Sequence, residues 1–248
     1  MAKVIVYVSG KGGTGKSTVS ATCAIMLANG QKRVLLVDCD SGMRGLDIML
    51  ALTSDIVYDL SDFVSGKCAI NRCIYNCADV PLLDLIPAPF DSEDEISPEL
   101  FRDIVNGLSA NYDYIIIDSP AGLGGGFVTA AFAAQTAVLV ANTEPTSLSG
   151  CQKARQKLVE LGVDEIRLII NKFNRESFEK LGLYADLDEV IDIAGAQLLG
   201  IVPEDYALIA GMQKGELLKK HKHSPAFRAL GAIARRLGSE NVPLLYKG

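Results

Sequence analysis

The sequence predicts a doubly wound α/β fold, in which a mainly parallel sheet of seven or eight strands carries helices on both faces. Short apolar runs rich in Val, Ile and Leu alternate with longer stretches of helical character, the pattern of successive βαβ units. Several runs end directly in acidic or polar residues, as expected at the carboxyl edge of a parallel sheet, where ligands bind. With 248 residues, 49 % of them hydrophobic, we expect one domain over residues 1–248.

The first strand is predicted at residues 4–8, and residues 19–28, which lack Gly and Pro, predict the helix that follows. The loop between them has the spacing G-x-x-x-x-G-K-S/T of a P-loop. A chance glycine turn is the alternative, but strand, loop and helix occur in the order that the motif requires. The loop residues predicted to bind nucleotide are Gly10, Lys11, Gly12, Gly13, Thr14, Gly15, Lys16, Ser17 and Thr18.

The chemistry of phosphate binding explains this spacing. Glycines let successive backbone N–H groups turn inward and form an anion nest, and the helix N-terminus adds a partial positive charge. Lys16 is placed to reach the β- and γ-phosphates, and the hydroxyl of Ser17 to ligate Mg²⁺. The loop therefore predicts a nucleoside triphosphate as the substrate, with Mg²⁺ as the cofactor.

A second lysine, Lys11, directly follows Gly10. The resulting run Lys-Gly-Gly-Thr-Gly-Lys-Ser-Thr resembles the deviant P-loop of the MinD/ParA family of ATPases. In that family the early lysine reaches the nucleotide of a partner subunit, so the resemblance implies a catalytic role for Lys11 and a nucleotide-dependent homodimer. The alternative is a solvated loop cation.

Residues 33–40 form a short apolar run that ends in two acids, Asp38 and Asp40, and are predicted to be a buried strand. Residues 41–47 follow as a loop, and residues 38–47 resemble the family's switch I. On that resemblance Asp40 positions the attacking water or a magnesium-bound water, and Asp38 supports it. Acids that merely cap a strand end are the alternative for both.

Tyr114–Asp118 is the clearest buried strand, and an Asp at this place is the Walker-B arrangement, which predicts Asp118 as a magnesium ligand with Ser17 and Asp40. Residues 119–122 resemble the family's switch II, a loop that changes when the γ-phosphate is lost. Residues 124–126 are three glycines, which predict flexibility where the family usually carries a Glu or similar residue. We therefore expect the coupling between the γ-phosphate and the conformation of this loop to differ from that in the family.

The strand predicted at residues 166–170 is followed by Asn171. The resemblance implies that Asn171 reads adenine, since an amide both donates and accepts as the N6/N7 edge requires; a plain turn Asn is the alternative. The Asp of an N-K-x-D guanine reader is absent. Residues 198–205 resemble the family's last strand and its Pro-Glu-Asp loop, which implies that Pro203 and Glu204 border the adenine.

Further elements complete the alternation. Residues 55–79 are predicted to be short helices, residues 82–86 and 137–141 strands, residues 91–95 a solvated acidic loop, and Pro225–Leu237 an amphipathic helix that packs on the core. Ser97 caps a helix that begins at Pro98 and runs to about Ala110.

Residues 142–147 lead into another helix, whose start at residues 147–153 lacks the acids that MinD proteins use to contact the early lysine and an activator. This departure weakens the expectation of a MinE-like activator, and the activator is not identified.

Charge and length set the expected compartment and partners. Residues 1–210 carry 16 Lys and Arg against 28 Asp and Glu, a net charge of −12, whereas residues 211–248 carry 8 against 2, a net charge of +6. The acidic body argues against a general nucleic-acid coat, and the basic end is a candidate for weak contact with anionic membrane or DNA. No signal peptide or membrane span is evident, which predicts a cytoplasmic protein, peripheral at the membrane at most. Pro243 and the few residues after it leave little room for the basic membrane-targeting helix of MinD proteins, so we expect this chain to lack that helix.

Six cysteines suit that compartment as free thiols. Cys68, Cys73 and Cys77 lie close in sequence, but they lack the C-x-x-C pairs of common zinc sites. We expect half-buried thiols there, with metal ligation as the alternative.

Together these features predict a MinD-like ATPase that hydrolyses ATP to ADP and phosphate, dimerises with ATP and serves spatial organisation such as division-site placement. The residues expected to carry catalysis are Lys11, Lys16 and Asp40. Alternatives are a ParA-like DNA-partition or flagellar-placement ATPase, an iron–sulfur carrier, which the missing C-x-x-C disfavours, and a nucleotide-gated scaffold with little hydrolysis.

Overall fold

The computed structural model describes residues 1–41, 45–89, 96–213 and 224–244 of the chain. Its centre is an eight-stranded sheet in the order β3-β4-β2-β5-β1-β6-β7-β8. All neighbouring strands pair in parallel except β3 with β4, which pair antiparallel at one edge. The predicted doubly wound, mainly parallel sheet is confirmed. The strands are β1 Lys3–Val8, β2 Val34–Asp38, β3 Tyr75–Asn76, β4 Leu83–Ile86, β5 Tyr114–Asp118, β6 Thr136–Ala141, β7 Glu165–Phe173 and β8 Gln197–Pro203.

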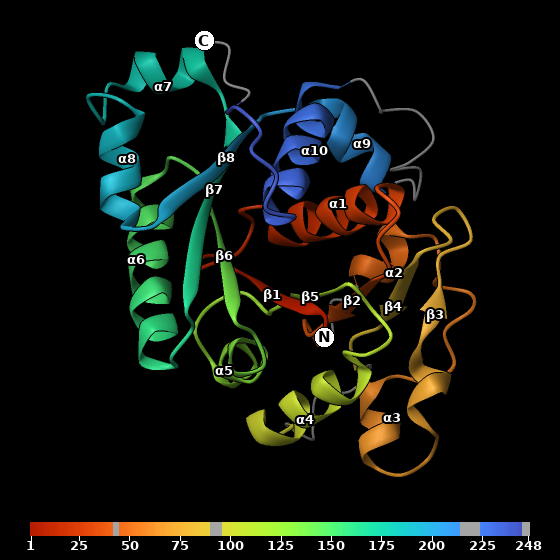
Figure 1. The fold of residues 1–248 in the computed structure, drawn as a ribbon. Coiled ribbons are helices and arrows are strands. Elements are labelled where there is room, and N and C mark those ends of the chain that lie inside the picture. Colours follow the sequence, from red (N-terminus) through yellow and green to blue (C-terminus); the bar gives the residue numbers. More distant parts are fainter. Residues whose placement is uncertain (42–44, 90–95, 214–223, 245–248) are drawn as a thin grey trace.

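Helices cover both faces of the sheet, because central strands that are apolar on both faces must be buried on both. The buried clusters show the division: α1, α2, α9 and α10 pack on one face, and α3, α4, α5, α6 and α8 on the other (Figure 1). The helices are α1 Lys16–Asn29, α2 Gly45–Met49, α3 Leu60–Val64, the 3₁₀ turn η1 Ile70–Cys73, α4 Pro98–Leu108, α5 Gly125–Phe132, α6 Pro145–Glu160, α7 Arg175–Leu181, α8 Leu187–Ala194, α9 Tyr206–Gln213 and α10 Pro225–Leu237. In the part of the chain that the structure describes, no helix is both long enough and apolar enough to cross a bilayer.

Three expectations about local structure need correction. The loop expected at residues 41–47 is wrong in its second part, since α2 begins at Gly45 and buries Leu46 in the core. The glycine run 124–126 is not merely a flexible link, because α5 begins at Gly125 and buries Phe127. Strand β7 continues through Asn171 to Phe173, which pairs with Pro203, instead of ending at Ile170.

In the stretch 55–79, the predicted short helices occur as α3 and η1, but β3 was not predicted. The N-terminal signals of α4 were read correctly: Ser97 accepts a hydrogen bond from the N–H of Leu100, and Pro98 is the first helical residue. The acidic loop 91–95 and residues 42–44 lie outside the described residues.

Candidate functional site

The carboxyl ends of seven parallel strands lie along one edge of the sheet, and the predicted site residues lie there. The end of β1 continues into the P-loop, while β2 ends at Asp38 and β5 at Asp118. The end of β7 carries Asn171, and β8 ends at Pro203. Because parallel strands present their carboxyl ends together, the fold gathers these residues from distant parts of the chain.

The P-loop has the backbone that its glycines predict. Gly13 and Gly15 adopt positive φ angles of 80° and 88°, which other residues rarely adopt. Gly10 needs to be glycine for a different reason: a Cβ there would lie 2.0 Å from the carbonyl oxygen of Gly150 in α6. Helix α6 therefore contacts the start of the loop directly, backbone against backbone.

Lys16 forms a buried ion pair at the centre of the site. Its Nζ atom lies 2.9 Å from Oδ1 of Asp118, and the two side chains are 5 % and 1 % exposed. Ser20 in α1 donates a hydrogen bond of 3.0 Å to the same carboxylate oxygen. Among the described residues, three buried side-chain oxygens have no hydrogen-bond partner: Oδ2 of Asp118 and Oγ1 of Thr14 at this site, and the hydroxyl of Tyr7 in β1. Unsatisfied buried groups beside a phosphate loop fit a site built for a charged ligand.

Asp38, the last residue of β2, lies close to Asp40 in the segment that follows. The carboxylate of Asp38 accepts a hydrogen bond of 2.9 Å from the N–H of Asp40. Burial, and next the nearby charge of Asp118, raise the pKa of Asp38 to about 7, although the hydrogen bond and Lys16 oppose the rise. Burial also raises the pKa of Asp40, against the opposing effect of Lys16. Asp38 is therefore poised to change its protonation state near neutral pH.

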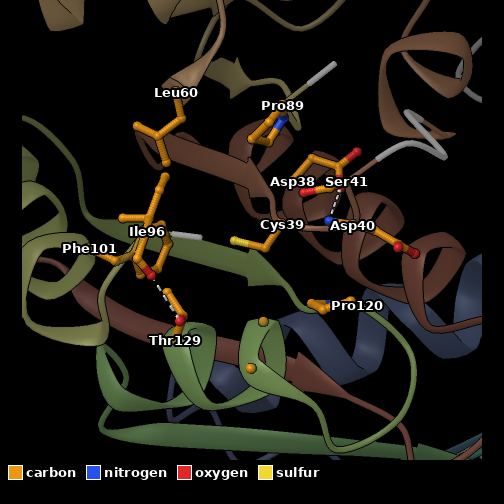
Figure 2. Close-up of a pocket in the computed structure, with 12 residues that line it drawn as sticks. Asp38, Cys39, Asp40, Ser41, Leu60, Pro89, Ile96, Phe101, Pro120 and Thr129 are labelled. Atoms are coloured by element: carbon orange, nitrogen blue, oxygen red, sulfur yellow. Dashed lines mark hydrogen bonds between the residues drawn. The ribbon is translucent and has the colours of Figure 1, made fainter. Parts of the chain in front are cut away.

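A pocket of about 300 Å³ lies beside these two acids (Figure 2). Residues 38–41 and Pro120 line one part of it, so the two predicted switch segments share its wall. Its other walls are mainly apolar, with Leu60 from α3 and Phe101 from α4. The loop after β5 is tied to β1, since the N–H groups of Ser119 and Gly122 donate to the carbonyls of Tyr7 and Ser9.

Lys11 takes no part in the buried ion pair and contacts a different part of the chain. Its ammonium group lies 2.6 Å from the carboxylate of Glu144 and 3.0 Å from the hydroxyl of Thr146, at the N-terminal end of α6. Its side chain is 43 % exposed. Residues 147–153 carry no acid, but Glu144 lies just before the helix and supplies a carboxylate to Lys11.

The end of β7 reaches across to the P-loop. The amide nitrogen of Asn171 donates a hydrogen bond of 2.8 Å to the carbonyl of Thr14, and Nζ of Lys172 donates one of 2.7 Å to the carbonyl of Gly13. Glu204 lies beside this segment, because its N–H donates to the carbonyl of Phe173. An amide also has a second N–H and an oxygen, so contact between Asn171 and adenine stays a prediction compatible with this geometry.

Sequence reasoning missed several of these partners, chiefly Ser20, Glu144 and Lys172. A carboxylate immediately before the expected helix start at Pro145 was an available signal for Glu144. The motif has no signal for Ser20 or Lys172, whose contacts depend on how α1 and β7 pack.

The comparisons with known proteins agree with this geometry. A family model described as "AAA domain" matches residues 2–172. The septum site-determining protein MinD of Synechocystis is 35 % identical over 99 % of this chain and 92 % of its own length. The chain belongs to the MinD/ParA family of P-loop ATPases.

Solved structures of this family superimpose closely. The MinC:MinD cell division protein complex of Aquifex aeolicus contains a chain 34 % identical, with a TM-score of 0.91 and 99 % of each chain covered. The MinD of Pyrococcus horikoshii, solved with Mg-ADP, is 29 % identical, with a TM-score of 0.85 and 96 % of each chain covered. The prediction of a MinD-like ATPase in the MinD/ParA family is confirmed.

The remaining cysteine prediction concerns Cys68, Cys73 and Cys77. The thiols of Cys68 and Cys73 lie 3.4 Å apart, and Cys73 donates to the carbonyl of Asp59. Cys73 and Cys77 are buried and Cys68 is half-buried. Within residues 1–41, 45–89, 96–213 and 224–244, no group of three or more His, Cys, Asp or Glu side chains is arranged to hold a metal ion.

Proposed function

We propose that this MinD-like ATPase hydrolyses ATP with Mg²⁺ in an ATP-bridged homodimer, and that the dimer serves in placing the division site. The observation that carries the proposal is the difference in burial and contacts between two lysines of the P-loop. Lys16 is buried on Asp118 within the loop, whereas Lys11 is exposed and directed to the protein surface. This contrast supports a role for Lys16 with the chain's own nucleotide and a role for Lys11 at a second subunit.

Nucleotide binding would use the buried ion pair. Lys16 exchanges Asp118 for the β- and γ-phosphates, and the N–H groups of the loop bind the phosphate oxygens. Ser17, whose hydroxyl lies 3.4 Å from Nζ of Lys16, would hold the magnesium ion together with Asp118, while Asp40 holds one of its waters. When bound, the ion draws charge from the phosphates as the γ-phosphoryl group is transferred. The unpartnered Oδ2 of Asp118 supports this assignment.

Hydrolysis would depend on Asp40. This half-buried carboxylate lines the pocket beside Asp38 and would orient the attacking water there, and the hydrogen bond to Asp38 fixes its backbone. The adenine base of the nucleotide would lie near Asn171, Pro203 and Glu204, which the fold brings close together. Lys11 would leave Glu144 and neutralise phosphate charge in the partner subunit.

The relatives' names support the cellular role. Several are septum site-determining proteins, and one solved relative is a complex of MinD with MinC. A partner of that kind, and action in the cytoplasm with peripheral membrane contact, are proposals for this chain.

A ParA-like role on DNA is the second candidate, and the basic end of the chain favours it. Of its cations, Lys214, Lys219, Lys220, Lys222 and Lys247 lie outside the described residues, as do Leu245 and Tyr246. Among the described ones, Arg235 pairs with Glu240, and Arg236 donates to the carbonyls of Leu199, Val242 and Pro243. Pelleting with duplex DNA and with anionic liposomes, with ATP or ADP and at rising salt, separates the two roles.

Steady-state phosphate release tests the enzymatic proposal. The wild-type protein should hydrolyse ATP, and Asp40→Ala should bind ATP but hydrolyse it on the order of 100-fold more slowly, since a group used mainly in the transition state is lost. Normal turnover by Asp40→Ala would refute the assignment of Asp40. No turnover in the wild-type protein, despite ATP binding, would favour a nucleotide-gated scaffold.

A further inference from the structure

Two consecutive side chains at the end of β7 reach the same loop. Asn171 donates to the carbonyl of Thr14 and Lys172 to that of Gly13, at 2.8 and 2.7 Å. In a regular strand, neighbouring side chains point to opposite faces. The arrangement therefore requires a break in the strand at this point.

The break is visible in the backbone of Lys172. Its φ angle is 54°, in the left-handed region that a lysine rarely adopts, and the β7–β8 register shifts between Ile170 and Phe173. The segment after it is held in place, since Phe173 accepts a hydrogen bond from the N–H of Glu204. Unfavourable backbone conformations of this kind persist where the surroundings hold them, and they cluster at functional sites.

The two bonds act on the part of the loop that binds phosphate. In a planar trans peptide unit the C=O and the following N–H point in opposite directions. Holding the carbonyl of Gly13 therefore directs the N–H of Thr14, and holding the carbonyl of Thr14 directs the N–H of Gly15. These N–H groups belong to the anion nest of the P-loop.

The fit between strand and loop is close. A Cβ at Gly15 would lie 2.4 Å from the amide nitrogen of Asn171, and 3.7 Å from Cε of Lys172. Gly15 thus serves the contact with β7 as well as its own φ angle of 88°. The loop and the two side chains form one packed unit.

We propose that Lys172 is a positioning residue which, with Asn171, holds the P-loop in its phosphate-binding conformation before nucleotide arrives. The proposal rests on nucleotide binding at this loop, as proposed above. A loop that is already ordered loses less conformational entropy when nucleotide binds. This lower entropic cost favours binding of the substrate and of the transition state equally. Lys172 should therefore affect Kd and KM, and leave kcat unchanged.

Lys172→Asn is the sharpest variant. Asparagine tolerates the left-handed conformation, so the backbone is preserved, but its side chain is much shorter than that of lysine and loses the bond to Gly13. We expect the Kd for Mg·ADP, measured by calorimetry, to rise about tenfold, the size of one lost charge-assisted hydrogen bond. Hydrogen exchange at the amides of residues 12–16 should also quicken in the nucleotide-free protein, while Tm stays within a few degrees.

Two further variants separate positioning from general effects. Lys172→Arg keeps a long cationic donor and should restore tight binding. Lys32→Asn removes an exposed lysine near the far end of α1 and should bind Mg·ADP like the wild type.

Each other outcome has a defined meaning. Equal Kd values for wild type and Lys172→Asn, with the wild type binding normally, would overturn the positioning role alone. Failure of the wild type to bind Mg·ADP would instead overturn the proposed function. A fall in kcat at unchanged KM would make Lys172 a residue of the chemical step, and a large loss of Tm without rescue by arginine would leave it a merely structural residue; either result overturns the proposal.

Discussion

The ammonium group of Lys11 lies 2.6 Å from the carboxylate of Glu144, across a separation of 133 residues in the sequence. The pair joins the P-loop to the first turn of α6, and the charge of Lys11 lowers the pKa of Glu144, chiefly through the hydrogen bond. Any role of Lys11 in a second subunit must compete with this contact. If Lys11 acts in a second subunit as proposed, the pair would oppose dimerisation as long as it is intact.

Glu144→Gln should weaken this competition. Exposed ion pairs contribute about 0.2–1 kcal/mol, so the ATP concentration that gives half-maximal dimer should fall about two- to fivefold. Light scattering during an ATP titration measures this concentration. The control is Glu160→Gln, which removes an exposed acid from the other end of α6. A higher ATP requirement in Glu144→Gln would mean that Glu144 assists the dimer instead of opposing it.

The buried pair of Lys16 and Asp118 should matter for folding as well as for binding. Lys16→Ala leaves a carboxylate that is 1 % exposed without its counter-charge, so the free energy of unfolding should fall by about 3 kcal/mol. Lys16→Ala/Asp118→Asn removes both charges and should recover most of the loss. Urea unfolding of the nucleotide-free proteins measures both. If the double variant is no more stable than the single one, the charge explanation is wrong.

The raised pKa of Asp38 predicts how the free energy of unfolding depends on pH. Its pKa is raised to about 7 in the folded protein, so the unfolded chain releases this proton at lower pH than the folded one. Its contribution to stability is fully present below about pH 4 and is lost as the pH rises to about 7, a change of a few kcal/mol. The isosteric Asp38→Asn variant should gain stability relative to the wild type between pH 5 and pH 8. Urea midpoints that shift in parallel for the two proteins would show that the pKa of Asp38 is not raised.

Because Gly150 contacts Gly10, we expect Gly150→Ala to destabilise the protein, although such a change normally stabilises a helix. Alanine normally stabilises a helix by about 1 kcal/mol relative to glycine. A Cβ at Gly150 would, however, lie 2.8 Å from the carbonyl oxygen of Gly10, whereas one at Gly107 in α4 meets nothing within 4 Å. Gly107→Ala should therefore raise Tm, and Gly150→Ala should lower both Tm and nucleotide affinity. A stabilised Gly150→Ala protein with normal affinity would show that α6 does not constrain the loop.

Elements with strong local signals could be predicted to the residue. Tyr114–Asp118 contains three consecutive β-branched isoleucines, and Pro225–Leu237 combines helical spacing with Ser224 as its N-cap and Pro225 as its first residue; both bounds agree with the structure. Strand β3 could not be predicted, because two residues have no pattern and depend on pairing with β4. Helices α7 and α8 were also missed, and α7 buries none of its residues, so it has little amphipathic signal.

The same limit applies to the candidate site: residues with a local signal in the sequence could be predicted, but contacts between distant segments could not. The P-loop residues and the acids Asp38, Asp40 and Asp118 could be predicted, because each is fixed by its place after a strand. The contacts of Lys11 with Glu144 and of Lys172 with Gly13 could not, since they join segments more than 130 residues apart. Lys172 also adopts a backbone conformation that its residue type disfavours.

Sedimentation velocity tests the central claim most directly. The Asp40→Ala protein, which should retain ATP, is compared in Mg·ATP and in Mg·ADP. We predict a dimer with ATP and a monomer with ADP, and in the same background Lys11→Ala should bind ATP yet remain a monomer. An ATP-bound protein that stays monomeric with Lys11 intact would contradict the account.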